Sequence, residues 1–306
     1  MTDHCLSIWA LGNINFSRKK ALYCSANLIL VVEMRITILF ENHSGFKKGL
    51  FGGHGFSALV EHKRYKILVD TGVDGEILLR NMEALGIKPA DIDYLFLTHG
   101  HYDHTEGLKA LLEARRGKKL TIIAHPDIFA KRVALKPHLR DISLPFKREE
   151  LEELGAEFIL TRSPIQIVEG IYSSGEIERT TWDRTVGYRI ESGKLVKDDV
   201  KDDIALILDL GDSVAVITGC GHSGVINIAM HSQKVMNKSI RALIGGFHLI
   251  GAKPELLEEI AEKLKELKVK KLYAGHCTGF EAMGFFMTEF GKAFEPLYVG
   301  KVIELG

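Results

Sequence analysis

The stretch Thr98-His99-Gly100-His101-Tyr102-Asp103-His104 places three histidines and one aspartate within six consecutive positions. It follows a short apolar run, Tyr94–Leu97, and precedes a helical pattern. Neutral imidazoles and a carboxylate are ligands that a borderline metal such as zinc prefers, and one rigid turn can present all four. The alternative is a solvated turn that is histidine-rich by chance. A buried strand that ends where the cluster begins favours the metal site.

The overall composition bounds the classes of function. With 306 residues, of which 46% are hydrophobic and 26% charged, the chain has the make-up of an ordinary globular protein with one large domain or two small ones. Its 40 basic residues balance its 40 acidic ones, which argues against nucleic acid or an anionic membrane as the main partner. We therefore expect a small-molecule partner, and we leave self-association into a homo-oligomer open.

Cysteine and glutamine usage indicates the environment of the protein. The chain has four cysteines: Cys5, Cys24, Cys220 and Cys277. Their spacing is not that of a disulfide framework, so we expect reduced thiols and a cytoplasmic location. Glutamine occurs only at positions 166 and 233 while lysine and glutamate are abundant, a bias that favours a thermophilic source.

The first 33 residues differ from the rest of the chain. Arg18-Lys19-Lys20 followed by the apolar stretch Ala21–Val32 superficially resembles a signal peptide. The apolar stretch is too short to span a bilayer, and no clear cleavage site follows it. A strand-like run begins at Met34, which is an alternative natural start. We expect residues 1–33 to be a non-essential extension and residues 34–306 to form a single domain.

Hydrophobic periodicity and turn residues predict the same order of elements, β-β-α-β-α-β, in two halves of the chain. In the first half we expect strands at 56–61, 65–70, 94–97 and 120–124 and helices at 74–85 and 105–116. In the second half we expect strands at 204–209, 214–218, 242–246 and 271–274 and helices at 225–236 and 254–267. Between the halves we expect helices at 127–133 and 149–154 and strands at 157–160, 165–168, 171–173 and 187–190. This order predicts an α/β protein with four layers, helices on both outer faces of two sheets, and a site at one edge.

Further motifs stand where these strands are expected to end. Asp70-Thr71-Gly72, the cluster at 99–104, His222 and Gly275-His276 occur in an order and spacing that resemble the metallo-β-lactamase superfamily over residues 34–306. The segments GGHGFSALVE, VITGCGHSGVINI, ALIGGFHL and AGHCTG resemble a subfamily named after an archaeal pterin enzyme, 7,8-dihydropterin-6-methyl-4-(β-D-ribofuranosyl)-aminobenzene-5′-phosphate synthase. Because one fold serves many reactions, the resemblance implies the αββα metallo-β-lactamase sandwich more directly than it implies the reaction.

The resemblance implies a site for two divalent metals and assigns ligands by motif position. His99 and His101 match one metal, whereas Asp103, His104 and His276 match the other. Diiron members of the superfamily carry a carboxylate where this chain has His101. The residue at this position favours zinc, with iron and manganese as the alternatives.

Two ligands that the superfamily usually has are missing from their usual places. A bridging aspartate usually follows a Thr-Gly pair, and here Thr218-Gly219 is followed by Cys220. A further histidine usually lies upstream of that strand, where residues 140–200 contain none. His222 is the best replacement. Whether His222 joins the first metal or bridges the two, and whether Cys220 is a ligand, stays open at this point.

Other polar residues near the motifs have two interpretations each. Asp70 can accept hydrogen bonds from the cluster and from a ligand imidazole, or it can simply form the turn before a helix. His248 follows a strand and can bind substrate or move a proton, or it can be structural. His54 and Gly53 lie in the glycine-rich loop 42–55, and they divide in the same way. The backbone N–H groups of residues 51–55 could cradle a phosphate. We expect structural roles or no site role for the remaining residues of these types: Cys277, His125, His4, His43, His62, His138 and His231.

Three functions are compatible with such a site. The first is hydrolysis of a phosphorylated or ester small molecule, in which Asp103 orients the attacking water and His248 assists the leaving group. The second is the condensation that the pterin subfamily implies, which joins a dihydropterin to a ribosyl-aminobenzene phosphate. The third is metal binding without catalysis. We expect the hydrolase, with Asp103 and His248 as the catalytic residues.

Overall fold

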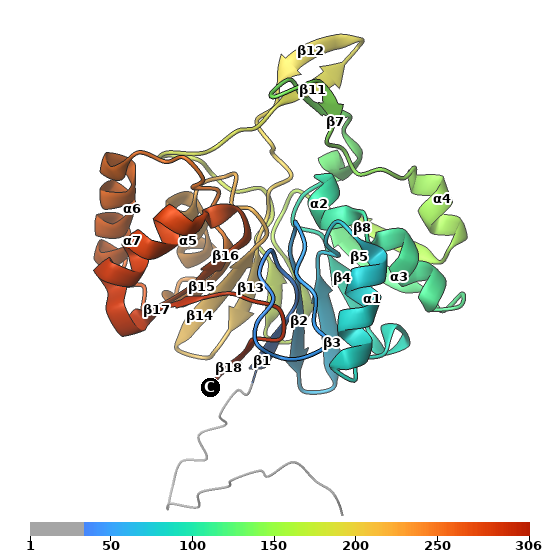
Figure 1. Ribbon diagram of the computed structural model, residues 1–306, viewed down its shortest axis with the longest axis horizontal. Coiled ribbons are helices and arrows are strands. Elements are labelled where there is room, and N and C mark those ends of the chain that lie inside the picture. Colours follow the sequence, from blue (N-terminus) through green and yellow to red (C-terminus); the bar gives the residue numbers. More distant parts are fainter. Residues whose placement is uncertain (1–33) are drawn as a thin grey trace, which may run out of the picture. The chain divides into compact units, whose positions relative to one another are not determined.

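The computed structural model describes residues 34–306, which build two seven-stranded sheets and a small third sheet (Figure 1). The first sheet has the order β18-β1-β2-β3-β4-β5-β8. Its strands are β1 (Met34–Phe40), β2 (Ser57–His62), β3 (Tyr65–Val69), β4 (Tyr94–Phe96), β5 (Leu120–Ala124), β8 (Ala156–Leu160) and β18 (Val302–Leu305). Strands β3, β4, β5 and β8 run parallel to one another.

The second sheet has the order β17-β16-β15-β14-β13-β10-β9. Its strands are β9 (Ile165–Val168), β10 (Ile171–Ser173), β13 (Leu206–Asp209), β14 (Ser213–Thr218), β15 (Ser239–Gly246), β16 (Lys271–Gly275) and β17 (Phe294–Pro296). Strands β14 to β17 run parallel. Each sheet therefore combines an antiparallel part with a parallel part, and the carboxyl ends of the parallel strands of one sheet meet at one edge.

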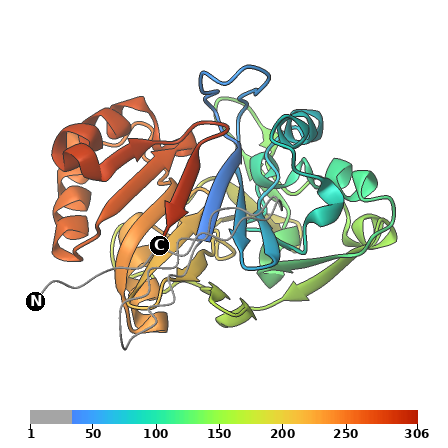
Figure 2. The same ribbon diagram turned by 90° about the horizontal axis from the view of Figure 1, so that it is seen from below.

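Helices cover the outer face of each sheet, on opposite sides of the two-sheet core (Figure 2). Those of the first half are α1 (Gly75–Ala84), α2 (Tyr102–Thr105), α3 (Leu108–Ala114) and α4 (Arg148–Glu153). Those of the second half are α5 (Val225–Met236), α6 (Pro254–Glu266) and α7 (Phe280–Phe290). Short 3-10 turns are η1 (Pro89–Asp91), η2 (Pro126–Phe129), η3 (His276–Thr278) and η4 (Gly291–Ala293). Asp74 caps α1, its carboxylate accepting a hydrogen bond from Ile77 N at 3.0 Å.

The apolar side chains form three buried layers, as a four-layer sandwich requires. Ile36 of β1 and Ile217 of β14 belong to the layer between the sheets. Leu78 of α1 packs in the layer outside the first sheet, and Ile260 of α6 in the layer outside the second. Removal of these side chains from water is the main force that holds helices and sheets together. The predicted αββα arrangement and the β-β-α-β-α-β order in both halves are confirmed.

The parallel strands carry the polar motifs to a common edge. Asp70 follows β3, the cluster at 99–104 follows β4, and Cys220 follows β14. His248 follows β15, and His276 follows β16 directly. Ligands at the carboxyl ends of parallel strands are the usual arrangement in open α/β sheets.

Three expectations about local structure are wrong in part. Residues 127–133 are not a helix, because the 3-10 turn η2 follows Pro126 and β6 (Arg132–Ala134) then pairs with β11. The helix expected at 105–116 is divided into α2 and α3 at Gly107, where a Cβ would collide with Thr71 O. Several described elements were not predicted: α7, β17, β18 and, in the sheet β12-β11-β6-β7, every strand except β11, which was predicted at 187–190. In that sheet, β12 is Lys194–Lys197, β11 is Tyr188–Glu191 and β7 is Arg140–Asp141.

The small third sheet stands beyond the two large ones, at the edge where α2 lies (Figure 1). An isolated bridge between His101 and Ser143 links this region to the histidine cluster. The predicted extension, residues 1–33, lies outside the described residues. No helix in the described part of the chain is both long enough and apolar enough to cross a bilayer.

Candidate metal centre

The histidine cluster is a tight, buried segment that runs from the loop after β4 into α2. His99 Nε2 lies 3.1 Å from His101 Nδ1, and the rings of His99 and His104 are 4.2 Å apart. Gly100 allows this turn, since a Cβ there would collide with Ile128 O. Burial lowers the pKa of His99 and His101 well below the ordinary value of 6.5, so both rings are neutral and ready to bind a metal.

Asp70 supports the cluster through hydrogen bonds to Thr98 and His104. Its Oδ1 accepts a hydrogen bond from Thr98 N at 2.8 Å, and its Oδ2 accepts one from Thr98 Oγ1 at 2.7 Å. The same Oδ2 lies 2.7 Å from His104 Nδ1, which leaves His104 Nε2 facing the centre. Burial opposes protonation, but the Asp103 and Asp70 carboxylates outweigh it and raise the pKa of His104 to about 9. Asp70 thus orients His104 and is turned away from the centre itself.

Asp103 faces three imidazoles. Its Oδ2 lies 3.3 Å from His54 Nε2, 3.3 Å from His276 Nε2 and 3.6 Å from His104 Nε2. Burial alone raises the pKa of Asp103. The charge of His104 and the close contacts with His276 and His54 more than offset this effect and hold the pKa of Asp103 well below its ordinary value. Asp103 is therefore an ionised carboxylate in the middle of the histidines.

The second half contributes His222, His276 and Cys220. His222 Nδ1 lies 2.9 Å from Arg184 O, so this nitrogen carries the proton and donates it. His276 Nδ1 donates in the same way to Asn42 Oδ1 at 2.8 Å. Both rings therefore direct an unprotonated Nε2 toward the cluster, where the His222 ring lies edge-to-face 4.9 Å from the rings of both His99 and His101.

Several buried nitrogens in this region have no partner among the described residues. They are His101 Nε2, His222 Nε2 and His248 Nδ1. Burial lowers the pKa of His222 to about 3 and also lowers that of His248. Unpartnered buried nitrogens of neutral imidazoles are costly unless a further group completes them.

The donor atoms gather in three overlapping groups, each with its ligand atoms within 4.8 Å of one another. The groups are Asp103, His104, Cys220 and His276; His99, Cys220 and His222; and Cys220, His248 and Cys277. Imidazole, carboxylate and thiol donors in such groups fit zinc and similar borderline metals.

The residues expected near a substrate lie at the rim of this centre. The side chain of His54 is half exposed beside Asp103, and the His248 ring is 4.3 Å from that of His222. Gly53 N donates to Glu41 O and Gly55 N to Asn42 Oδ1. The N–H groups of both glycines are therefore already hydrogen-bonded within the protein, which leaves them no proton to donate to a phosphate.

An apolar groove of about 880 Å³ includes His43, whose neighbour Glu41 contacts His276. Aromatic and thioether side chains line it together with two basic ones: His43, Phe46, Lys47, Phe280, Met283, Met287 and Tyr298. The His43 ring packs edge-to-face against Phe280 at 4.7 Å, and its Nδ1 lies 3.0 Å from Glu41 Oε2. Glu41 Oε1 accepts a hydrogen bond from His276 N. One carboxylate therefore connects the groove to a candidate ligand.

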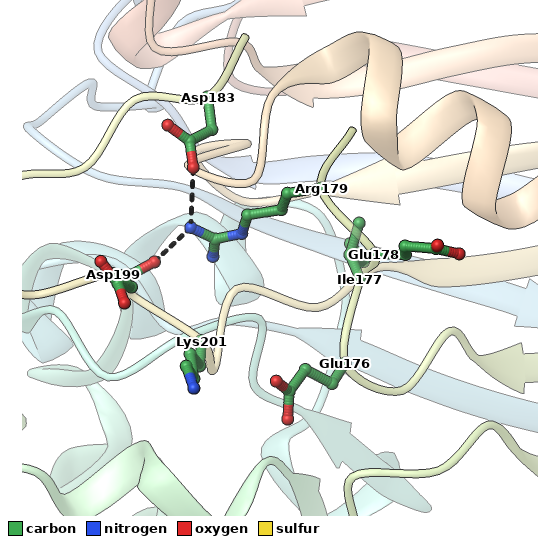
Figure 3. A pocket seen from close by; sticks show the side chains of 7 residues that line it. All are labelled: Glu176, Ile177, Glu178, Arg179, Asp183, Asp199 and Lys201. Atoms are coloured by element: carbon green, nitrogen blue, oxygen red, sulfur yellow. Dashed lines mark hydrogen bonds and ion pairs between the residues drawn. The ribbon is translucent and has the colours of Figure 1, made fainter. Parts of the chain in front are cut away.

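A smaller pocket of about 450 Å³ lies near His222 and is lined mainly by charged side chains (Figure 3). Arg179 crosses it to Asp183 at 3.2 Å and to the backbone oxygen of Asp199. The same guanidinium donates to Ser223 Oγ at 3.2 Å, next to His222. Since Arg179 already has these partners, we assign it to the support of the His222 turn.

Comparison with known proteins now decides the family. The sequence profile of the metallo-beta-lactamase superfamily matches residues 50–276. The chain belongs to the metallo-β-lactamase superfamily. It is 37% identical over 292 residues to the 7,8-dihydropterin-6-methyl-4-(beta-D-ribofuranosyl)-aminobenzene-5′-phosphate synthase of Methanocaldococcus jannaschii, which covers 91% of this chain and 99% of the relative. It is 35% identical over 273 residues to an uncharacterized protein of the same organism, covering 88% of this chain and 99% of that protein.

Among solved structures, Tm1679, described as a metal-dependent hydrolase of the beta-lactamase superfamily, superposes with a TM-score of 0.77 at 27% identity. The match covers 89% of this chain and 99% of that one. The predicted resemblance is confirmed, and the relatives identify the chain as an enzyme whose fold implies metal binding.

In this member of the metallo-β-lactamase superfamily, one supporting network was not predicted. Arg132 is fully buried, with Nε 2.6 Å from Asp198 Oδ2 and an Nη2 contact of 2.5 Å to Asp202 Oδ1. Asp202 Oδ2 in turn accepts a hydrogen bond from Gly100 N at 2.8 Å. The charges of these residues are ordinary in the sequence, and only the fold reveals that they hold the histidine loop.

Proposed function

We propose that the chain is a metal-dependent hydrolase that acts on a phosphorylated or ester small molecule. It would bind two divalent metal ions, with zinc as the preferred metal. One observation carries the proposal. The Nε2 atoms of His101 and His222 are buried without a partner in the described structure, beside an ionised Asp103. Neutral imidazoles and a carboxylate in this state are prepared for metal binding.

The residues divide between the two ions by their positions. His99, His101 and His222 would hold one ion, and Asp103, His104 and His276 the other. Two divalent metals held in this way lower the pKa of water toward about 7 and polarise a phosphoryl or acyl oxygen. Iron or manganese in place of zinc would use the same residues.

We assign the remaining roles in catalysis to Asp103, His54 and His248. Because Asp103 stays ionised, it can accept a hydrogen bond from the attacking water and orient it. His54 donates to Asp103 at the exposed rim and limits its movement. Burial lowers the pKa of His248, so its ring is neutral and offers an N–H to the leaving oxygen. Its positive φ of 49° fixes the direction of the side chain.

The proposal is tested by His101→Ala and Asp103→Ala, assayed on a panel of phosphoesters and carboxylic esters with metal content measured in parallel. We expect turnover to fall by more than about 100-fold in both, which exceeds the usual loss from an outer hydrogen-bond partner. The far-UV circular dichroism should be retained. The exposed His138→Ala is the matched control and should leave turnover unchanged. Full activity in either site variant contradicts the assignment.

A second function is favoured by the relative of 37% identity, which is named as a synthase. In this alternative, a dihydropterin with an activated methylene is condensed with a ribosyl-aminobenzene phosphate. The apolar groove supports it, because Phe46, Phe280 and Tyr298 suit a planar ring and Lys47 suits an anionic group. Incubation with both substrates separates the functions: a coupled product supports condensation, and hydrolysis of either substrate alone supports the hydrolase.

We also propose that residues 34–306 form the complete catalytic domain. A chain that begins at Met34 should then keep the metal content, the turnover and the thermal stability of the full chain. Loss of any of these would show that residues 1–33 take part in the fold. Sedimentation of both chains would reveal whether the protein forms a homo-oligomer.

A further inference from the structure

The fold carries the side chain of Cys220 into the centre. Gly219 precedes it at the end of β14, where a Cβ would collide with Thr98 Oγ1 and would lie 2.8 Å from Asp70 Oδ2. The backbone is thus pressed against the histidine loop, so the next side chain has to enter the space between the two halves. Cys220 is 2% exposed.

The sulfur of Cys220 contacts candidate ligands of the second ion. Its Sγ lies 3.2 Å from His104 Nε2 and 3.3 Å from His276 Nε2. With Asp103, these three residues form a group of four donors within 4.8 Å of one another. A thiol that served only as a small core side chain would be expected among apolar neighbours instead.

The same sulfur also belongs to the donor set of the first ion. Its distances to the ligand atoms of His99 and His222 are within 4.8 Å. His101 Nε2 and His222 Nε2, both on this side, are buried and unpartnered in the described structure, which independently points to an absent ligand. The sulfur of Cys220 therefore lies within 4.8 Å of donor atoms from both sets.

Cys277 provides an internal contrast. It is also buried, but its Sγ lies 3.4 Å from the backbone oxygen of Cys220, to which it can donate its S–H. Its donor group contains only Cys220 and His248, and neither Asp103 nor His99 belongs to it. A sulfur at position 277 thus supports the turn at 220, whereas the sulfur at 220 faces both ligand sets.

We propose that Cys220 is a thiolate ligand shared by the two metal ions, a role that rests on the proposed two-metal function. On metal binding the thiol would release its proton to solvent, and the sulfur would form bonds to both ions. A thiolate favours zinc, iron or cobalt over harder ions such as manganese and magnesium. The centre would therefore select softer ions than one with a carboxylate at position 220.

The test uses cobalt(II) and absorbance, so its outcome is independent of turnover. We expect the metal-free full chain to develop a near-ultraviolet sulfur-to-cobalt charge-transfer band that grows through both the first and the second equivalent. Cys220→Ala should lose the band and bind fewer than two equivalents, whereas Cys277→Ala should keep it. Cys220→Asp should bind two equivalents without the band.

Three results would overturn the inference. The first is a wild-type chain that binds two equivalents of cobalt without the band. The second is a band that is complete after the first equivalent. The third is a band that Cys220→Ala keeps and Cys277→Ala loses. The wild-type titration decides even where a variant does not fold. Hydrolysis that fails on every substrate, together with a shared-sulfur band, would reject the proposed reaction and leave the role of Cys220 intact.

Discussion

The two halves of the molecule supply the candidate centre in different ways. The first half gives four donors from six consecutive residues, 99–104, in the loop after β4 and in the short helix α2. The second half gives three, Cys220, His222 and His276, from the ends of two strands. The first set is supported by two buried carboxylates, those of Asp70 and Asp202. In the second set, neutral oxygens orient the rings: the backbone oxygen of Arg184 for His222 and the amide oxygen of Asn42 for His276.

This difference indicates where the centre is rigid. Asp70 and Asp202 hold the cluster from opposite sides through Thr98 and Gly100. His222 is oriented by a backbone oxygen, Arg184 O, in a segment without regular structure. We infer that the first half is a preformed platform and that the second half completes it. Preformed donors supported by outer hydrogen bonds bind metals more tightly than loosely held ones.

The largest effect is expected on stability, from the network of Arg132, Asp198 and Asp202 that supports the histidine loop. Arg132→Met leaves Asp198 and Asp202 as buried, unpaired carboxylates, which should lower the free energy of unfolding by about 3–5 kcal/mol. Urea unfolding at neutral pH measures this. Arg148→Ala removes an exposed ion pair with Glu152 and should cost less than about 0.5 kcal/mol. Equal losses in both variants would mean that the platform has no special support.

The next effect concerns Asp70. In Asp70→Asn the amide nitrogen replaces an oxygen that now accepts from both Thr98 Oγ1 and His104 Nδ1. We expect a metal affinity at the His104 site that is weaker by about 10- to 100-fold, measured by competition with a chelator. Asp74→Asn is the control, because asparagine caps helices as well as aspartate does. An unchanged affinity in Asp70→Asn would remove Asp70 from the platform.

A smaller effect is expected on the side of the second half. Asn42→Ala removes the acceptor of His276 Nδ1, but Glu41 still holds the backbone of His276. The metal affinity should therefore fall by about tenfold, near the lower limit for an outer partner. The exposed Ser44→Ala should have no effect. If Asn42→Ala weakened binding more than Asp70→Asn, the contrast between the halves would be reversed.

The smallest effect is a pH dependence at the groove. The hydrogen bond to Glu41 raises the pKa of His43 above 6.5 and outweighs burial. Protonated His43 therefore stabilises the folded chain below the unfolded pKa, and this contribution is lost as the pH rises through the folded value. The stability difference between wild type and His43→Gln should be larger at pH 5.5 than at pH 8.5 in urea unfolding. A difference that grows with pH would have the wrong sign.

Local patterns predicted the fold well because the chain repeats one order of elements with clear periodicity. Helix α5 occupies the predicted residues, and Asp74 caps α1 as its position suggested. The segment 126–200 was less predictable because its structure depends on distant contacts. Arg132, for example, lies in β6, and its charge is neutralised by Asp198 and Asp202, which are more than 60 positions away in the sequence.

The candidate site divides in the same way. The cluster at 99–104 is legible because its donors are adjacent in the sequence. The support by Asn42, Arg184 O and Asp202 is invisible without the fold, since these groups lie 38 to 234 positions from the residues they hold. The role of the glycine-rich loop as a phosphate cradle stays a prediction. The sequence does not reveal that the N–H of Gly53 donates to Glu41 O.

The metal content of the purified full chain, measured by elemental analysis with turnover assayed on the same sample, tests the central claim most directly. We predict two equivalents of metal per chain, zinc for preference, with turnover that disappears on chelation and returns when the metal is restored. A fully active chain with one equivalent of metal, or with none, would contradict a centre that both halves complete.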